Sequence, residues 1–575
     1  MAFDKFKRTL ISALTVCVMV VIFTPITLAD DEEASVLPSI YMLLFDDAVE
    51  EIEMADAARF LMQATYGPTL DEIVALTNSS YESWLDQQFA LPATSHLDFG
   101  LDINFFIETV SGLNSNRSNR LSVWNRIAME APDQLRQRMA FALSQIFVVS
   151  DVSSDLILHH AHTQYYDLLV ENAFTSYREL LEIVSLDQAM GLYLGMAGNQ
   201  RASVVRNVMR PDENFAREVM QLFSIGLVEL ELDGTPKLDS QGNEIPTYDQ
   251  AMVEEFAKVF TGWHLSFIAD AVSATFNQQR ETQYYRSPTM LAFSDFHDIT
   301  SKTLLNVPGI NPVIPPNQTA EQELEQALDI LASHPNVAPF ISKQLIQRFV
   351  TSNPSRAYVR RISTVFNNTD GNLQAVLRAI LLDVEARQGH LTNPETFGKI
   401  KEPMLKLTGL WRGIGFIKTT PFSGNTLEPI EYLNQIPGGA PSVFNFYRPD
   451  FSPSQVFTDR RAVSPEAQLL TQSTIVNMGE AFTDFTLRTS EDEDFLIPIA
   501  TDHLEELVPD NFMRPAELID HLNIVLLAGA MPVEMRTMLL NLHSGAGGYT
   551  ASNKLTVVND ILYLVTLSPY FNVQR

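Results

Sequence analysis

Hydrophobic residues recur at helical spacing along most of the chain. In the segment 54–67, Met54, Ala58 and Leu61 fall on one stripe, and Gly67 ends the pattern. The same periodicity predicts further helices in segments 69–89, 133–150, 165–195, 211–226, 248–264, 321–334, 336–350, 355–367, 372–387 and 400–415, with more beyond residue 463.

Three stretches interrupt this periodicity. Segment 227–250 mixes apolar and acidic residues around two turn signals, Asp233-Gly234 and Gln241-Gly242, which predicts a β-hairpin inserted between helices. Segment 265–320 predicts loops and short strands, and segment 416–463, centred on "PGGAPSVFNFYRPDFSP", is rich in loops. The predicted fold is therefore mostly α, a large multi-helix body with a small β-hairpin insertion and long irregular loops.

The N-terminus has the features of a secretory signal. Three basic residues precede an apolar run from Leu10 to Phe23, Pro25 follows, and small residues lead up to Ala29. We expect residues 1–29 to be a signal peptide removed on export, although an uncleaved membrane anchor is the alternative. After cleavage we expect no stable membrane span, and a location that is periplasmic or extracellular.

The remaining chain divides by pattern. Residues 30–54 form an acidic lead-in that we expect to be disordered, and residues 55–570 form a single large helical domain. Two lobes, 55–264 and 321–570, would be joined by the loop-rich segment 265–320.

Composition narrows the possible functions. The 575 residues are 46% hydrophobic and 19% charged, which is typical of a globular protein. A formal net charge of -31 disfavours nucleic acid as a partner. The one cysteine, Cys17, lies within the predicted signal, so the mature chain has no disulfide, thiolate metal site or cysteine nucleophile.

Common catalytic motifs are absent. The chain has no phosphate-binding P-loop, no H-E-x-x-H zinc motif and no G-x-S-x-G nucleophile elbow, and "HSGAGGY" at 543–549 is best interpreted as a loop. We assign no metal ligands and leave the cofactor unknown. Two weaker patterns have alternative interpretations: a histidine cluster could hold a transition metal or simply be solvated, and an acidic turn region could hold calcium or form Asx turns. Their residues are His159, His160 and His162 for the first, and Asp233, Asp239, Asn243 and Glu244 for the second.

The stretch "PDENFAREVMQLFSIG" at 211–226 bunches polar groups at one helix end. Its apolar arc, which should face a core, consists of Phe215, Val219, Leu222 and Phe223. Glu213 and Arg217 stand four apart and can pair, Asn214 and Glu218 form another stripe, and Asp212 fits the N-cap position. Helix stability explains all of these groups, but the wall of a binding pocket would show the same pattern.

A second group of candidate residues lies in "FSDFHDITSK". His297, Asp298 and Lys302 fall in the irregular segment, where functional loops concentrate. A carboxylate beside a histidine can tune its pKa or share a metal, although a loop histidine can also be merely solvated.

Seven motifs together resemble one bacterial family. They are "RMAFALSQIFVVS", "ENAFTSYRELLEIVSLDQAMGLYL", "PDENFAREVMQLFSIGL", "FTGW", "FHD…K", "ASHPNVAPFISKQLIQRFV" and "KIKEPMLKLTGLWR", in that order. The chain is similar over residues 55 to 570 to the family catalogued as domain of unknown function 1800. The resemblance implies a mainly helical, exported bacterial protein with a phosphatase- or sulfatase-like genomic neighbour, and it implies no activity.

The resemblance also marks particular positions. The residues that match the family's motifs are Glu213, Asn214, Arg217, Glu218, Thr261, Gly262, Trp263, His297, Asp298, Lys302, His334 and Pro335. Asp212 stands where the family often has Asn, and both residues cap helices.

Two hypotheses on function follow. The first is a helical binding or assembly protein of the cell envelope, whose partner would be the phosphatase- or sulfatase-like neighbour. The second is an extracytoplasmic hydrolase, in which Glu213 and Glu218 supply acid/base chemistry and Arg217 holds an anionic group. His297 and Asp298 would then transfer protons or assist through a metal. In either case Asn214, Trp263 and Lys302 are candidate binding residues.

Overall fold

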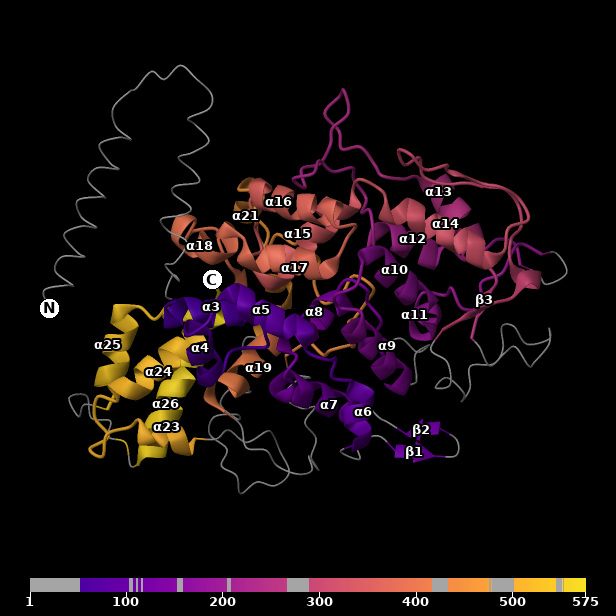
Figure 1. The fold of residues 1–575 in the computed structure, drawn as a ribbon. Helices are drawn as coiled ribbons and strands as arrows, with labels where there is room; N and C mark the ends of the chain where they lie inside the picture. Colours follow the sequence, from indigo (N-terminus) through magenta and orange to yellow (C-terminus); the bar gives the residue numbers. More distant parts are fainter. Residues whose placement is uncertain are drawn as a thin grey trace, which may run out of the picture. The chain divides into compact units, whose positions relative to one another are not determined.

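The predicted helical periodicity appears as many short helices (Figure 1). The structure is a computed structural model, and it describes residues 52–102, 107–109, 112–114, 117–152, 159–203, 208–265, 289–415, 433–474, 477, 501–543, 551 and 553–575. The predicted signal peptide, most of the acidic lead-in, the side chains of His159 and His160 and nearly all of "HSGAGGY" lie outside them. The mostly α prediction is confirmed.

Helices dominate the first half of the chain. They are α3 (Met54–Ala64), α4 (Leu70–Thr77), α5 (Tyr81–Ala90), α6 (His96–Asp102), α7 (Arg117–Glu130), α8 (Gln134–Ser144), α9 (His159–Glu171), α10 (Tyr177–Leu186), α11 (Gln188–Tyr193), α12 (Asn214–Gln221) and α13 (Gln250–Val259). The predicted helix at 69–89 is in fact two helices, because the Ser80 hydroxyl accepts a hydrogen bond from the backbone of Ser83 and starts α5.

The second half is also helical. Its helices are α14 (Ala320–Ala332), α15 (Val337–Phe349), α16 (Arg356–Asn368), α17 (Leu373–Leu382), α18 (Val384–Thr392), α19 (Pro403–Ile414), α21 (Gln455–Asp459), α23 (Asp502–Glu506), α24 (Ala516–Leu527), α25 (Val533–Asn541), α26 (Lys554–Leu567) and α27 (Pro569–Asn572), with 3-10 turns η4 (Ser294–Phe296) and η5 (Pro465–Leu469).

The described strands are short and pair only in twos, always antiparallel. The pairs are β1 (Ile107–Thr109) with β2 (Gly112–Asn114), β3 (Trp263–His264) with β4 (Leu291–Ala292), β5 (Lys302–Thr303) with β6 (Val313–Ile314), and β7 (Lys399–Ile400) with β8 (Val573–Gln574). β3 to β6 lie in or beside the segment for which loops and short strands were predicted.

The predicted hairpin insertion is present as antiparallel pairing around two turns. Segment 227–247 forms isolated bridges rather than continuous strands, pairing Leu230 with Pro236 and Leu238 with Glu244. Its two turns fall at the predicted glycines, Gly234 and Gly242, both with positive φ. Asx turns build the region, because Asp233 and Asp239 accept hydrogen bonds from backbone N–H groups two residues further on.

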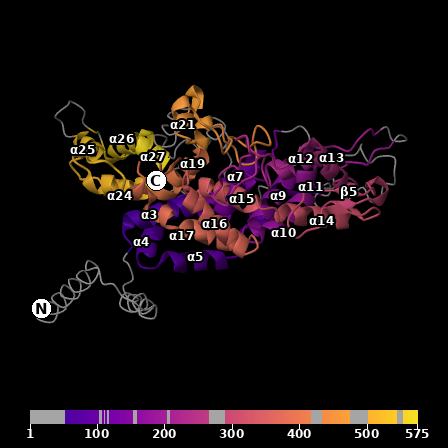
Figure 2. The same cartoon turned by 90° about the horizontal axis from the view of Figure 1, so that it is seen from above.

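One large hydrophobic cluster runs through helices of both predicted lobes. Helix α17 packs against α3 and α5, α15 against α8, and α10 against α14. In two perpendicular views, α24 to α26 lie at one end of the helices and α12 to α14 at the other (Figures 1 and 2). Residues 52–575 form one compact unit, so the lobes share their core.

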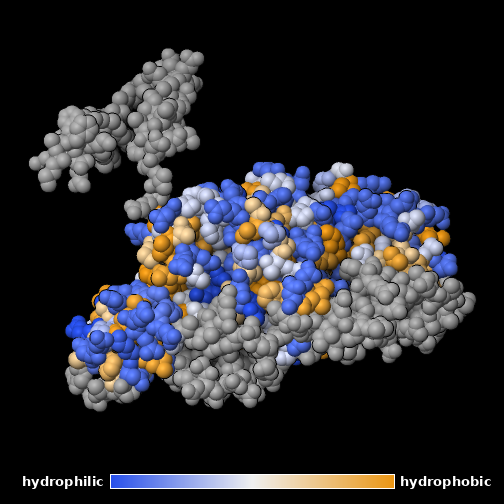
Figure 3. Space-filling view, turned by 60° about the horizontal axis from the view of Figure 1, so that its bottom comes forward, coloured by the Kyte–Doolittle hydropathy of each residue, from blue (hydrophilic) through white to orange (hydrophobic). Residues whose placement is uncertain are grey.

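On the face in Figure 3, hydrophobic residues form small scattered groups among hydrophilic ones. Among the described residues, no helix combines the length and the apolar character needed to cross a bilayer.

Candidate functional site

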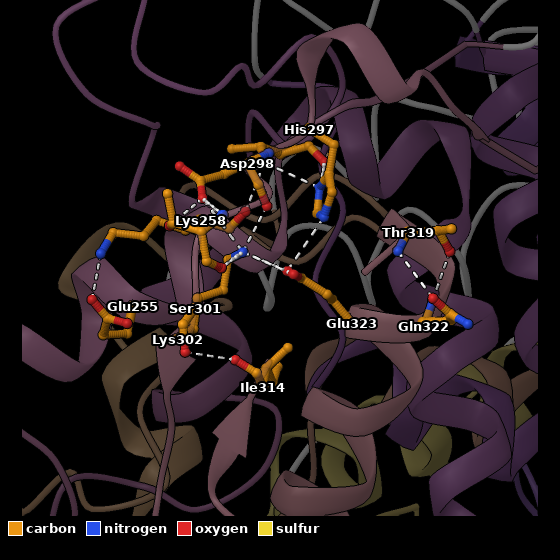
Figure 4. Close-up of polar contacts among 12 residues, drawn as sticks. Glu255, Lys258, His297, Asp298, Ser301, Lys302, Ile314, Thr319, Gln322 and Glu323 are labelled. Carbon is orange, nitrogen blue, oxygen red and sulfur yellow. Dashed lines mark hydrogen bonds and ion pairs between the residues drawn. The ribbon is translucent and has the colours of Figure 1, made fainter. Parts of the chain in front are cut away.

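Lys302 stands at the centre of a buried ion cluster, the Lys302 cluster, formed with His297, Asp298 and Glu323 (Figure 4). Its Nζ donates hydrogen bonds to the carbonyl oxygens of Asp298 at 2.6 Å and Thr300 at 2.9 Å, and to Glu323 Oε1 at 2.9 Å. Glu323 Oε2 lies 2.8 Å from the same nitrogen and Asp298 Oδ1 lies 3.4 Å from it. Each N–H of the ammonium group therefore has an acceptor.

His297 joins this cluster to the end of α13. Its Nδ1 lies 2.9 Å from the carbonyl oxygen of Thr261, and its Nε2 lies 3.3 Å from Glu323 Oε2, at ion-pair distance. The Thr261 hydroxyl accepts a hydrogen bond from the backbone N–H of Asp298 at 2.8 Å. A Cβ on Gly262, whose φ is +84°, would lie 2.9 Å from His297 Cβ. The "TGW" and "FHD" motifs thus meet in space, and the glycine allows their contact.

The Lys302 cluster is closed to solvent. His297 and Lys302 are each 1% exposed and Glu323 is 0% exposed, so a substrate cannot reach them unless the chain opens. Burial alone raises the pKa of Asp298, but hydrogen bonds from Thr300 and the charge of Lys302 outweigh it and lower that pKa below its usual value. The geometry indicates that the Lys302 cluster holds α13, segment 297–303 and α14 together. The catalytic roles of its residues remain predictions.

The polar groups at the start of α12 form a different network. Glu213 Oε2 accepts hydrogen bonds from Arg217 at 3.2 Å and from Gln250 Nε2 at 2.9 Å, so the predicted Glu213–Arg217 pair is present. The prediction that Asp212 occupies the N-cap is wrong by one residue. Glu213 holds that position without a side-chain cap, and Asp212 Oδ1 accepts from the backbone of Asn214 in an Asx turn.

Asn199, which the sequence patterns did not single out, connects α12 with the "TGW" segment. Its side chain donates to the carbonyl oxygens of Asp212 at 3.2 Å and Phe260 at 3.3 Å and accepts from the backbone of Asp212. Its own carbonyl accepts from Gly262 at 2.8 Å. Asn214 extends the network by donating to Leu194 O at 3.1 Å. These side chains hold backbone segments together, which explains several family-matching positions without any chemistry.

Glu218 differs from its neighbours on α12. It is buried, its Oε2 has no hydrogen-bond partner, and burial raises its pKa while Arg217 opposes the rise. Burial and the nearby Glu218 charge raise the pKa of Tyr193 to about 12. Burial likewise raises the pKa of Tyr248 to about 12, and the Tyr248 hydroxyl is buried without a hydrogen bond. A carboxylate that tends to keep its proton is a candidate general acid.

Among the described residues, no hydrogen bond or ion pair joins the predicted acid/base residues of α12 to His297. The described hydrogen-bond and ion-pair partners of His297 are Thr261 and Glu323, and neither Glu213 nor Glu218 is among them. Trp263 lies in β3, is 3% exposed, and its carbonyl accepts a hydrogen bond from Gly198 at 2.8 Å. Glu213 and Arg217 therefore belong to one network and His297 and Asp298 to another, and Asn199 links the two through backbone groups in the described part of the chain.

A pocket of about 300 Å³, which we call the Arg348 pocket, lies elsewhere. It is bordered by the residues following α8, by the end of α12 and the turn after it, by α15, and by the loop 443–450. Its polar lining includes Gln145, Gln344, Arg348, Asn445 and Tyr447, and its apolar lining includes Ile146, Leu222, Leu227, Phe340, Val443 and Phe444.

The sequence patterns missed this pocket. Loop 443–450 belongs to "PGGAPSVFNFYRPDFSP", which was interpreted only as loop. The available signal was Gln344 and Arg348 four apart on α15, where an amphipathic helix places side chains on one face. Both prove to be buried. Only the fold shows that the loop closes over them.

Arg348 has an unusual environment. Its guanidinium stacks on the ring of Tyr447, with Cζ 4.6 Å from the ring centroid, and no described residue hydrogen-bonds to its side chain. Arg348 is 4% exposed. The backbone carbonyl of Arg348 accepts hydrogen bonds from Arg138 at 2.6 Å and Lys399 at 2.9 Å, so the pocket sits on a buried group of charges.

That buried group, the Glu402 cluster, consists of Arg138, Arg348, Lys399, Glu402 and Glu466. Lys399 Nζ lies 3.0 Å from Glu466 Oε1 and 3.5 Å from Glu402 Oε1. Glu402 Oε2 accepts hydrogen bonds from the amides of Gln145 and Gln435, both at 2.6 Å. Burial alone raises the pKa of Glu402, but Lys399, Arg138 and Arg348 reverse this and lower it. Glu402 is therefore held ionised.

No metal centre is evident in the described ranges. Within them, no three histidine, cysteine, aspartate or glutamate residues are grouped closely enough to hold a metal ion.

Taken together, the fold and these networks define a large helical protein with charged clusters buried inside it. The chain belongs to the family described as "Protein of unknown function (DUF1800)", which matches residues 59–573. No curated protein and no solved structure matches the chain.

Proposed function

We propose that the protein is an exported binding protein of the bacterial cell envelope that works with a phosphatase- or sulfatase-like partner. The observation that supports a binding role is the Arg348 pocket, because its polar lining offers hydrogen-bond donors and a cation around a concave, partly apolar space. Among the candidate acid/base residues, in contrast, Glu213 is bonded to Arg217 and Gln250, whereas His297 and Asp298 belong to the Lys302 cluster.

The test begins with the protein isolated from its native envelope fraction. We expect intact mass to show a mature chain beginning at Asp30, and native mass spectrometry to show a stoichiometric partner or a bound small molecule. A species that retains residues 1–29 in the cytosol would contradict export. A mature protein that carries neither partner nor ligand, and binds neither when mixed with the neighbouring phosphatase-like protein, would contradict the binding role.

A hydrolase remains the second candidate function because of Glu218. Its buried, unbonded Oε2 and raised pKa suit a general acid. Phosphate- and sulfate-ester hydrolysis by the purified protein, compared with Glu218→Gln and with the exposed-helix control Glu254→Gln, decides the matter. Turnover that is lost only in Glu218→Gln would favour this second function over the first.

A further inference from the structure

The Arg348 pocket presents donors that lack acceptors. Arg348 Nε, Gln344 Nε2 and Asn445 Nδ2 are buried, and none of them has a hydrogen-bond partner among the described residues. The three residues are 4%, 8% and 6% exposed, and all line the pocket. Buried N–H groups in folded proteins are nearly always paired, so three orphaned donors around one cavity indicate a missing acceptor.

Charge identifies the kind of acceptor. In the Glu402 cluster, three cations (Arg138, Arg348 and Lys399) face two carboxylates (Glu402 and Glu466), which leaves one buried positive charge unmatched. At the pocket's border Arg448 and Asp450 lie 3.7 Å apart and offset each other. Water could satisfy the N–H groups but would not neutralise the excess charge, whereas an anion would do both.

The apolar residues of the lining indicate what kind of molecule carries the anionic group. Leu222, Leu227, Phe340 and Phe444 line the same cavity, and Leu227 and Phe444 are 55% and 45% exposed at its border. Apolar side chains that remain exposed beside a charged pocket floor match a ligand with an apolar portion.

We propose that the Arg348 pocket binds an organic oxyanion, a carboxylate or phosphate group carried on an apolar body. Arg348 contacts the anion with its guanidinium, Gln344 and Asn445 donate further hydrogen bonds, and the apolar lining covers the body of the ligand. This inference rests on the proposed binding function and adds to it the chemical class of the ligand.

The proposal is tested by calorimetric titration of the purified mature protein. The probes are octanoate and octyl phosphate, 1-octanol as the uncharged match, and acetate and inorganic phosphate as anions without an apolar body. We expect octanoate or octyl phosphate to bind at least tenfold more tightly than the other three. The preference between the two distinguishes a carboxylate from a phosphate ligand. Binding of 1-octanol as tight as that of octanoate, or no binding by either octyl anion, would overturn the proposal.

Variants locate the site. Arg348→Gln should weaken binding of the preferred anion at least tenfold, and the exposed control Arg356→Gln should not change it. Gln344→Leu removes an orphaned donor, so it should weaken anion binding while leaving the melting temperature of the free protein equal or higher. This keeps the test valid even if Arg348→Gln fails to fold. Unchanged anion affinity in Gln344→Leu and Arg348→Gln would refute the assignment of the pocket.

The two proposals can fail separately. Retention of a stoichiometric envelope partner by a protein that binds none of the anions would refute the oxyanion site and leave the binding function standing. Absence of partner and ligand alike would refute both.

Discussion

Neutralising Glu323 should destabilise the protein much more than neutralising an exposed glutamate on the same helix. In Glu323→Gln, Lys302 stays buried with its two carbonyl acceptors and with Asp298 Oδ1 at 3.4 Å, but it loses the full charge of a carboxylate at 2.8 Å. The remaining carboxylate is farther away and cannot replace the first. Glu325, on the exposed face of α14, provides the matched control.

The magnitude follows from burial. Breaking a buried ion pair by removing one partner costs about 3–5 kcal/mol, because an uncompensated charge is left inside. With an unfolding entropy of about 2.1 cal/mol/K per residue over a unit spanning residues 52–575, each kcal/mol shifts the melting temperature by about 1 °C. Glu323→Gln should therefore melt about 3–5 °C lower, and Glu325→Gln within about 1 °C of the parent protein.

Differential scanning calorimetry of a double-mutant cycle measures this effect. Replacing a whole buried pair by apolar side chains is often nearly neutral, so Glu323→Leu with Lys302→Met should recover at least half of the loss seen in Glu323→Gln. A melting temperature for Glu323→Gln equal to that of the Glu325→Gln control would refute the reasoning. The reasoning would also be refuted if the fall in melting temperature of the double variant equalled the sum of the falls for Glu323→Leu and Lys302→Met.

Three further outcomes are expected. Gly262→Ala should lose about 2–4 kcal/mol in chemical denaturation, because its Cβ would lie 2.9 Å from His297 Cβ at a φ of +84°; an unchanged midpoint would contradict this. Burial raises the pKa of Asp187 from 3.8 to about 7. As the pH rises, Asp187 therefore ionises in the unfolded chain before it ionises in the folded protein, and the free energy of unfolding falls between these two pH values. Asp187→Asn should abolish that fall and be more stable by about 4 kcal/mol at pH 8, as melting at pH 4 and 8 would show. Asn336→Ala removes three hydrogen bonds to segment 225–230 and should speed amide exchange there at a cost of about 1–3 kcal/mol.

Local signals predicted the helices well and their ends less well. The α3 pattern and the Asp249 cap of α13 were predicted, because spacing and capping depend on neighbours in sequence. The break between α4 and α5 was missed because the apolar periodicity continues across Ser80. That continuity predicts one helix, whereas the Ser80 cap starts a second one. The start of α12 was misplaced because Asp212 can serve either as a cap or as an Asx turn, and its contact with Asn199 favours the turn.

The partners of the site residues could not be predicted from local sequence patterns. Sequence patterns identified His297, Asp298 and Lys302, but their partner Glu323 lies on α14 and follows the helical pattern of an ordinary exposed residue. The sequence alone does not mark Arg348 as a site residue. An arginine near the C-terminal end of a helix is usually solvated, and the helix dipole favours a cation there. Its burial results from the approach of loop 443–450, a contact between segments about a hundred residues apart, which periodicity cannot report.

The two buried clusters should behave differently because the Glu402 cluster borders the Arg348 pocket. In the Lys302 cluster, the ammonium group has all its hydrogen bonds made within the chain, and His297, Lys302 and Glu323 are buried. This network fixes three segments, and its His297 Nε2 and Glu323 Oε2 lie 3.3 Å apart at ion-pair distance without a hydrogen bond. The Glu402 cluster has one more cation than carboxylates, and Arg348 is a cation of this cluster that also lines the pocket. In a chain whose net charge is -31, keeping an unpaired guanidinium buried is costly unless something outside the chain completes it. Arg348 connects this stability argument to binding, because it belongs to the Glu402 cluster and also lines the pocket.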